Sequence, residues 1–145
     1  MSEKDPRTSS LLDAIARACA DTLGENLVGV YVHGSLAFGC FTWDRSDVDF
    51  LVVAREDLAH EDKMRLISAL MALWPLCPPK GLEMSVALRR DLDPFAYPTP
   101  FVLHLSGAHL AACRADLAGY CRRMNGVDPD LAAHVTVLRQ VGYAL

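Results

Sequence analysis

The sequence predicts an α/β protein in which a mixed central sheet is flanked by helices. Three segments of strand length are rich in β-branched and other apolar residues, at 27–33, 47–54 and 82–88. The segments at 11–23 and 56–73 instead carry apolar residues at helical spacing. A chain in which strands alternate with amphipathic helices is typical of a sheet covered by helices.

The composition is that of one globular domain. The chain has 145 residues, of which 52% are hydrophobic and 22% charged, and this length can bury a sizeable core. A formal net charge of -4 does not favour nucleic acid as a partner. The five cysteines include no C-x-x-C pair, which indicates reduced thiols and argues against zinc. With no signal-peptide pattern and no apolar run of membrane-spanning length, we expect a cytoplasmic protein without a membrane partner.

Caps and turn residues divide the first half of the chain. Ser9 or Ser10 is predicted to cap the first helix, and Gly24 to end it. A strand, a Gly-Ser turn, a short helical segment, a loop and a second strand follow, at 27–33, 34–35, 36–38, 41–46 and 47–54. The second of these strands is apolar on both faces after its first residues, which predicts a central strand covered on both sides.

The second half continues the alternation. Pro75 stops the helix at 56–73, and the strand at 82–88 alternates between an apolar face and a face that carries Glu83. From Arg89 onward, three prolines predict an extended loop. The remaining predicted elements are a strand at 101–105, a helix at 110–122, a helix from Asp128 or Asp130 toward Arg139, and a strand at 141–145.

Two carboxylates stand at the start of the second strand. Asp47 and Asp49 are separated by one residue, so they project from the same face of a strand, and Val48 faces the other way. Carboxylates at the head of an apolar strand are costly to desolvate unless they are paired or bind a metal. Mg²⁺ prefers such oxygen ligands. The alternative is that Asp47 caps the loop and Asp49 lies at a solvated sheet end.

Gly34, Ser35 and Glu83 extend this pattern toward a nucleotide site. A glycine lets backbone amides approach a phosphate, and the serine hydroxyl adds a donor. Glu83 supplies a third carboxylate, and three convergent acids provide both metal ligands and a base for phosphoryl or nucleotidyl transfer. The alternatives are an ordinary Gly-Ser turn and a solvent-facing glutamate on a strand.

Other polar and aromatic residues are interpreted as structural. The five histidines are scattered and are assigned to packing or to the surface. Trp43 lies in the loop before the aspartates, where contact with a nucleotide and packing of the loop tip are equally good interpretations. The Arg89-Arg90 pair is assigned to a solvated strand end.

These motifs resemble a known family. The residues Gly34-Ser35, a spacer ending in Gly39, and then S-D-V-D with an apolar strand resemble the polymerase-beta-like nucleotidyltransferase fold. The stretches LEMSVALRRDLDPFAYPTPFVLHLSGAHL and MNGVDPDLAAHVTVLR are similar to the aminoglycoside adenylyltransferases that modify streptomycin and spectinomycin. The resemblance covers nearly all of the chain from Leu11 onward.

The resemblance implies roles for the motif residues. It implies that Gly34, Ser35 and Ser46 hold the triphosphate of ATP, and that Asp47 and Asp49 bind two Mg²⁺ ions. Glu83 matches the family's catalytic base, which deprotonates a drug hydroxyl that then attacks the α-phosphorus of ATP and releases pyrophosphate. The small-molecule substrates would be ATP and an aminoglycoside.

The resemblance also bears on domain organisation. Residues 1–145 correspond to the nucleotidyltransferase domain, and the family's C-terminal helical domain is absent from this chain, so activity of these residues alone is open. We expect some self-association through the surface that such a domain would cover. Two alternative functions stay open: a minimal nucleotidyltransferase that adenylylates a protein partner, as an antitoxin does, and a nucleotide-binding domain without activity.

Overall fold

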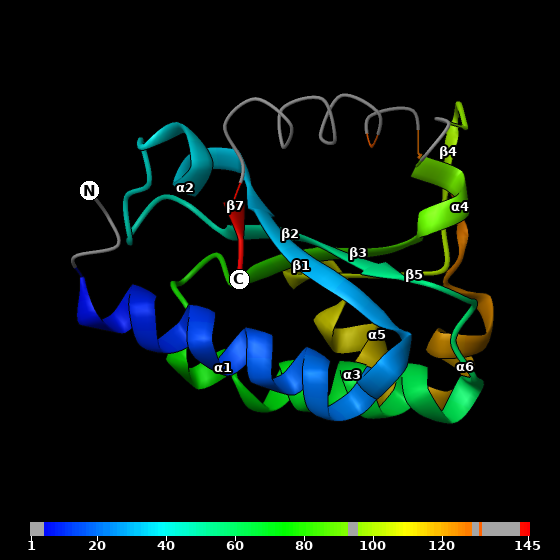
Figure 1. Ribbon diagram of the computed structural model, residues 1–145. Coiled ribbons are helices and arrows are strands. Elements are labelled where there is room, and N and C mark those ends of the chain that lie inside the picture. The colour runs from blue at the N-terminus through cyan, green and yellow to red at the C-terminus, as the bar shows by residue number, and fades with distance from the viewer. Residues whose placement is uncertain (1–4, 93–95, 129–130, 132–142) are drawn as a thin grey trace.

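The centre of the molecule is a mixed sheet, seen in the computed structural model, which describes residues 5–92, 96–128, 131 and 143–145 (Figure 1). In this sheet the described residues contribute five strands, in the order β5-β3-β2-β1-β7. Their bounds are β1 Leu27–His33, β2 Val48–Ala54, β3 Leu82–Leu88, β5 Leu103–Ser106 and β7 Tyr143–Ala144. The pair β2-β3 is parallel, and the other pairs are antiparallel. The predicted mixed sheet is confirmed, with β2 in the central position predicted from its apolar run.

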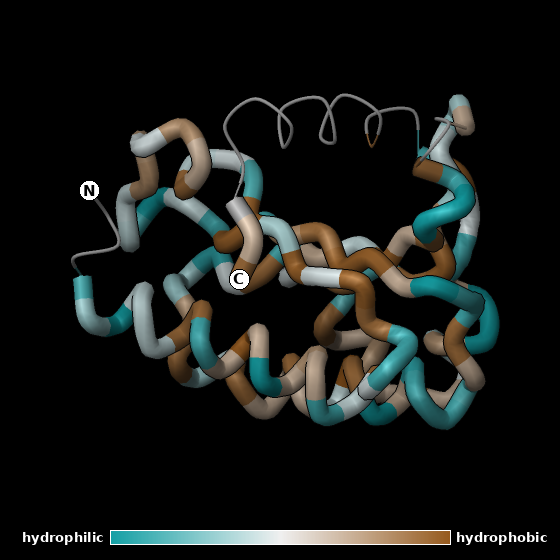
Figure 2. Tube along the Cα trace, in the orientation of Figure 1, coloured by the Kyte–Doolittle hydropathy of each residue, from teal (hydrophilic) through white to brown (hydrophobic). Residues whose placement is uncertain are grey.

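Helices cover one face of this sheet. They are α1 Pro6–Leu23, α3 His60–Ala72, α5 Leu110–Ala115 and α6 Leu117–Arg123. α1 and α3 run side by side across that face (Figure 1). Figure 2 shows hydrophobic residues along the central strands and alternating hydrophobic and hydrophilic residues along these helices. No described helix combines the length and the apolar composition that a membrane span needs.

The main core fills the space between the helices and the sheet. Large side chains from both layers are fully buried in it, among them Ile15, Phe50, Leu66, Leu70 and Met84. Each such side chain contributes about 2 kcal/mol through removal from water. This layer therefore holds β2 and β3 in place from the helix side, and the acidic residues at the start of these strands lie on the opposite face.

Two helix boundaries differ from the prediction. α1 begins at Pro6 because the Asp5 side chain caps it, accepting a hydrogen bond of 2.9 Å from the backbone N–H of Arg7, so the predicted cap at Ser9 or Ser10 is wrong. α3 begins only at His60. The segment before it is held by Asn26, whose side-chain amide makes two hydrogen bonds with the backbone of Glu56.

The chain after β3 differs more. Arg89–Leu92 forms a short helix, α4, in place of the extended loop predicted from Arg89. The predicted strand at 101–105 is split at Val102 into β4 Thr99–Phe101 and β5, and β4 pairs with β6 Gly126–Asp128 in a separate ribbon. Asp128 therefore lies in a strand and does not start a helix.

The predicted helix at 110–122 is also interrupted. Asp116 separates α5 from α6, because its carboxylate caps α6 by accepting a hydrogen bond of 3.0 Å from the N–H of Gly119. Most of the helix predicted toward Arg139 lies outside the described residues. Leu131 is described, and it packs on the far face of the sheet with Leu51, Val53 and Ala87. The last predicted strand is confirmed in its described part, as β7.

A glycine at the start of β3 sets the position of the parallel strands. Gly81 has a positive φ of 76°, and its carbonyl accepts a hydrogen bond of 3.0 Å from the N–H of Val48 at the start of β2. A Cβ at Gly81 would lie 2.3 Å from the Trp74 ring. Any other residue would therefore push the ring or the turn out of place.

We predict that Gly81→Ala destabilises the fold more than Gly39→Ala does. Both glycines have nearly the same positive φ, which costs alanine about 1–2 kcal/mol. A Cβ at Gly39 meets no atom within 4 Å, whereas the clash at Gly81 adds about 1–3 kcal/mol. Urea denaturation of both variants measures the difference. Equal losses of free energy of unfolding would show that the Trp74 contact does not constrain this turn.

Candidate functional site

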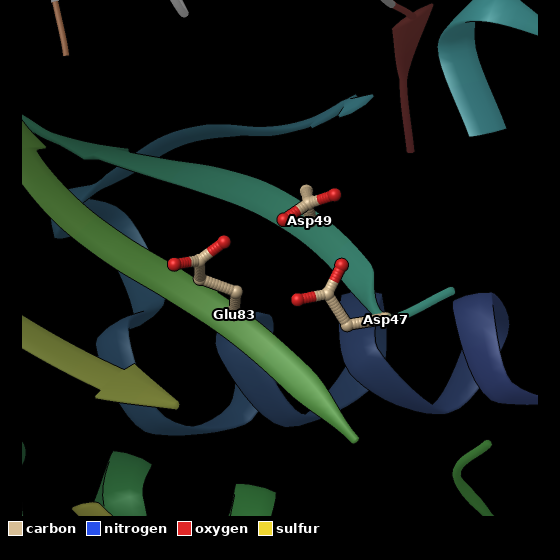
Figure 3. Close-up of side chains that lie close together, drawn as sticks. All are labelled: Asp47, Asp49 and Glu83. Carbon is tan, nitrogen blue, oxygen red and sulfur yellow. The ribbon is translucent and has the colours of Figure 1, made fainter. Parts of the chain in front are cut away.

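Three acidic side chains meet on the face of the sheet opposite the helices. Asp49 on β2 and Glu83 on β3 are direct partners in the parallel register, and Asp47 lies just before β2 on the same side. One carboxylate oxygen from each residue lies within 4.8 Å of the others. Figure 3 shows the three carboxyl groups facing a common space above the two strands. The structure therefore brings together the three acids that the sequence singled out.

The surroundings of Asp49 disfavour its ionised form. Burial, contact with Glu83 and the charge of Asp47 together raise the pKa of Asp49 to about 9. Three half-buried carboxylates this close require a proton or a cation among them. Their oxygen atoms are the ligand type that Mg²⁺ takes, so the donor set fits a magnesium site.

Gly34 lies directly against this cluster. It has a positive φ of 68°, and a Cβ there would lie 2.1 Å from Oδ2 of Asp49. It opens α2, which spans Gly34–Phe38, packs on β1 and β2, and ends at Gly39. Only glycine lets the chain turn this close to the carboxylate, so the turn and the acid cluster form one site.

The two serines predicted to hold a triphosphate are placed differently. The Ser35 hydroxyl is buried and has no hydrogen-bond partner among the residues that the structure describes. A phosphate oxygen would satisfy this donor. The Ser46 hydroxyl is already used, since it accepts a hydrogen bond of 3.0 Å from the N–H of Thr42 and closes the turn before Asp47.

Trp43 packs against neighbouring side chains, which is one of its two predicted roles. The guanidinium of Arg7 stacks 4.2 Å from the ring centroid, and the Phe41 ring packs edge-on at 6.4 Å. These contacts tie the loop before Asp47 to the first turn of α1. The loop that precedes Asp47 is thus held by the packing of Trp43 and by the hydrogen bond between Ser46 and Thr42.

One pair of residues beside the acids was missed. His104 was assigned to packing or to the surface, yet its Nδ1 lies 2.9 Å from Oγ of Ser85. Strand alternation already placed Ser85 on the same face as Glu83. The position of His104 follows only from the β3-β5 register. That register could not be predicted, because the sequence did not show that the strand is split at Val102.

Comparison with known proteins supports the same fold. No family model matches the chain, and no curated protein matches its sequence. The structure is similar to the crystal structure of spectinomycin adenyltransferase AAD(9) from Enterococcus faecialis with ATP and spectinomycin, with a TM-score of 0.79 and 19% sequence identity. The match covers 94% of this chain and 55% of that chain, so this chain spans about half its length. The predicted α/β fold is confirmed, and it is shared with that adenyltransferase structure.

We predict that Asp49→Asn stabilises the metal-free protein increasingly from pH 4 to pH 9. The raised pKa of Asp49 means that the folded state keeps a proton which the unfolded state loses above about pH 4, so this carboxyl lowers stability as the pH rises to about 9. In Asp49→Asn the free energy of unfolding does not show this decline with pH. Urea denaturation in EDTA at pH 5, 7 and 9 measures it, with exposed Asp13→Asn as the control. A gap between wild type and variant that does not widen with pH would contradict the raised pKa.

We also predict that Gly34→Ala weakens Mg²⁺ binding at least about tenfold, because changes in the residues that orient metal ligands typically cost about 10–100-fold in metal affinity. The added methyl group displaces the Asp49 carboxylate, whereas Gly39→Ala has the same backbone strain and open space around the Cβ. Isothermal titration calorimetry with MgCl₂ compares the two variants. Equal affinities would indicate that the cation does not use Asp49.

Proposed function

We propose that this protein is an ATP- and Mg²⁺-dependent nucleotidyltransferase that transfers AMP to a hydroxyl of an aminoglycoside of the streptomycin or spectinomycin type. The observation that carries the proposal is the convergence of Asp47, Asp49 and Glu83 beside the Gly34 turn. This convergence occurs on a fold shared with an adenyltransferase solved with ATP and spectinomycin. The five free thiols fit action in the cytoplasm, where ATP is available.

In this proposal the triphosphate lies at the turn between β1 and α2. Gly34 carries no side chain that would block approach, and the buried Ser35 hydroxyl donates a hydrogen bond to a phosphate oxygen. Ser46 contributes by holding the loop that precedes Asp47. ATP therefore binds with its phosphates directed at the acid cluster.

Asp47 and Asp49 are the proposed metal ligands. Their oxygens converge from one strand, and the raised pKa of Asp49 reflects a cluster that a cation would relieve. Mg²⁺ held by these two carboxylates would neutralise triphosphate charge and stabilise the attacking and leaving oxygens. Two ions are proposed, as the family resemblance implies, and Asp47 and Asp49 would hold them.

Glu83 is the proposed base. Its carboxylate accepts the proton of the acceptor hydroxyl, whose oxygen then forms a bond to the α-phosphorus of ATP. The bond from that phosphorus to the bridging oxygen breaks, and pyrophosphate leaves with the electron pair. Placement on β3, one strand away from Asp49, lets Glu83 reach the acceptor while the aspartates hold the nucleotide.

The proposed acceptor is matched by charge. The three acids and the net charge of -4 favour a cationic partner over an anionic one. An aminoglycoside combines several cationic groups with hydroxyls. The cationic groups match the negative charge of the site, and a hydroxyl provides the acceptor for AMP.

We predict drug-dependent AMP transfer that Glu83→Gln lowers by about 10²–10⁴-fold, the range for loss of a general base. The variant keeps its affinity for ATP, because Glu83 acts on the acceptor. Asp47→Asn loses the response to Mg²⁺, and Glu61→Gln on the exposed surface of α3 keeps wild-type activity. Pyrophosphate release, with mass spectrometry of the drug, follows the reaction with streptomycin and spectinomycin.

Two results would count against the proposal. ATP binding without pyrophosphate release under any drug would indicate a nucleotide-binding domain. Release that needs a protein partner, with AMP found on that protein, would replace the aminoglycoside as acceptor.

A further inference from the structure

A small cavity adjoins the acid cluster on the same side of the sheet. It has a volume of about 30 Å³, and Glu83 forms part of its wall. The other polar residues that line it come from β1, β3, β5 and β6, and are His33, Ser85, His104 and Asp128. The cavity therefore connects the proposed base to groups that the proposed reaction does not use.

Ser85 and His104 form a fixed pair in this wall. They are opposite residues of the antiparallel β3-β5 pair, and the Ser85 hydroxyl lies 2.9 Å from Nδ1 of the imidazole. The Tyr120 hydroxyl donates a hydrogen bond to the backbone carbonyl of His104. The rings of Phe101 and His109 pack on the imidazole at centroid distances of 6.0 and 5.5 Å. The ring has little freedom to turn.

The protonation state of His104 suits a hydrogen-bonding role. Burial lowers its pKa, so the ring is neutral at pH 7 and offers one donor and one acceptor nitrogen. With Nδ1 engaged by Ser85, the pair as a whole presents both a hydroxyl and an imidazole to its surroundings.

The Glu83 carboxylate shares the cavity wall with this pair. In Figure 3 one oxygen of Glu83 is turned toward Asp49 and the other is turned away from both aspartates. Ser85 lies two residues further along β3 and on the same face. A cavity of about 30 Å³ holds one water molecule, which needs two to four polar partners, and these walls supply them.

We propose that this cavity holds a water molecule hydrogen-bonded both to the Glu83 carboxylate and to the Ser85–His104 pair. Through it, Ser85 and His104 are positioning residues for the base. The water donates to the carboxylate and fixes the direction of the oxygen that accepts the substrate proton. This inference rests on the proposed function, because it gives Glu83 the role of base. A base displaced by about 1 Å loses about 10²-fold in rate, so such an anchor matters for turnover.

Crystal structures test the water site without any assay of activity. Wild type at high resolution is expected to show one ordered water within hydrogen-bond distance of Glu83 and of Ser85 or His104. His104→Phe is expected to remove that water and leave Glu83 with more than one conformer. A dry cavity in wild type, or a direct contact between Glu83 and His104, would overturn the inference.

Kinetics test the positioning role. His104→Phe is expected to lower kcat about tenfold, with KM for ATP within about twofold of wild type, and His104→Gln to recover part of the loss. In a Glu83→Gln background, His104→Phe is expected to have no further effect. His60→Phe, at the exposed start of α3, is the matched control. Equal losses in both backgrounds would assign His104 a general structural role and overturn the inference.

The two proposals fail in distinguishable ways. A wild type that transfers no AMP to any acceptor overturns the proposed function, and the crystal structures still decide whether the water site exists. An active wild type whose cavity is dry, or whose rate does not depend on His104, overturns only the positioning inference.

Discussion

The parallel pairing of β2 with β3 is the constraint on which the site depends. It places Asp49 opposite Glu83, and side chains alternate along each strand, so a slip of one residue would turn Glu83 into the core. The register is protected by apolar residues on the helix face, such as Phe50 and Met84, which would then be exposed. The hydrogen bond from Val48 to Gly81 fixes where the pairing begins. The core layer thus determines which acids meet on the other face.

Much of this arrangement followed from local patterns. The bounds of β1 and β3 matched, because apolar runs between turn residues mark strands well. The face shared by Asp47 and Asp49 followed from strand alternation, and Gly34 from its place in a turn. The roles of Gly34, Ser35, Ser46, Asp47, Asp49 and Glu83 remain predictions, because geometry brings groups together without showing what they bind.

The errors have identifiable causes. Asp5 and Asp116 cap helices, but other polar residues nearby could have done so equally well. A single sequence does not say which of these side chains accepts a hydrogen bond from a free N–H at the helix start. Prolines after Arg89 suggested a loop, but the first of them follows the short helix α4. The partner of His104 depended on pairing between β3 and β5, and a tertiary register of this kind leaves no local trace.

The route by which the chain connects β2 to β3 has a consequence for how the protein reaches its native state. Asp47 and Asp49 are neighbours in sequence, whereas Glu83 is separated from them by the crossover through α3. We expect mutual repulsion of the three acids to be absent from early, locally ordered states and to act when β3 docks. The electrostatic cost of bringing the three acids together then opposes the pairing of β3 with β2, and a divalent cation bound among them would offset that cost.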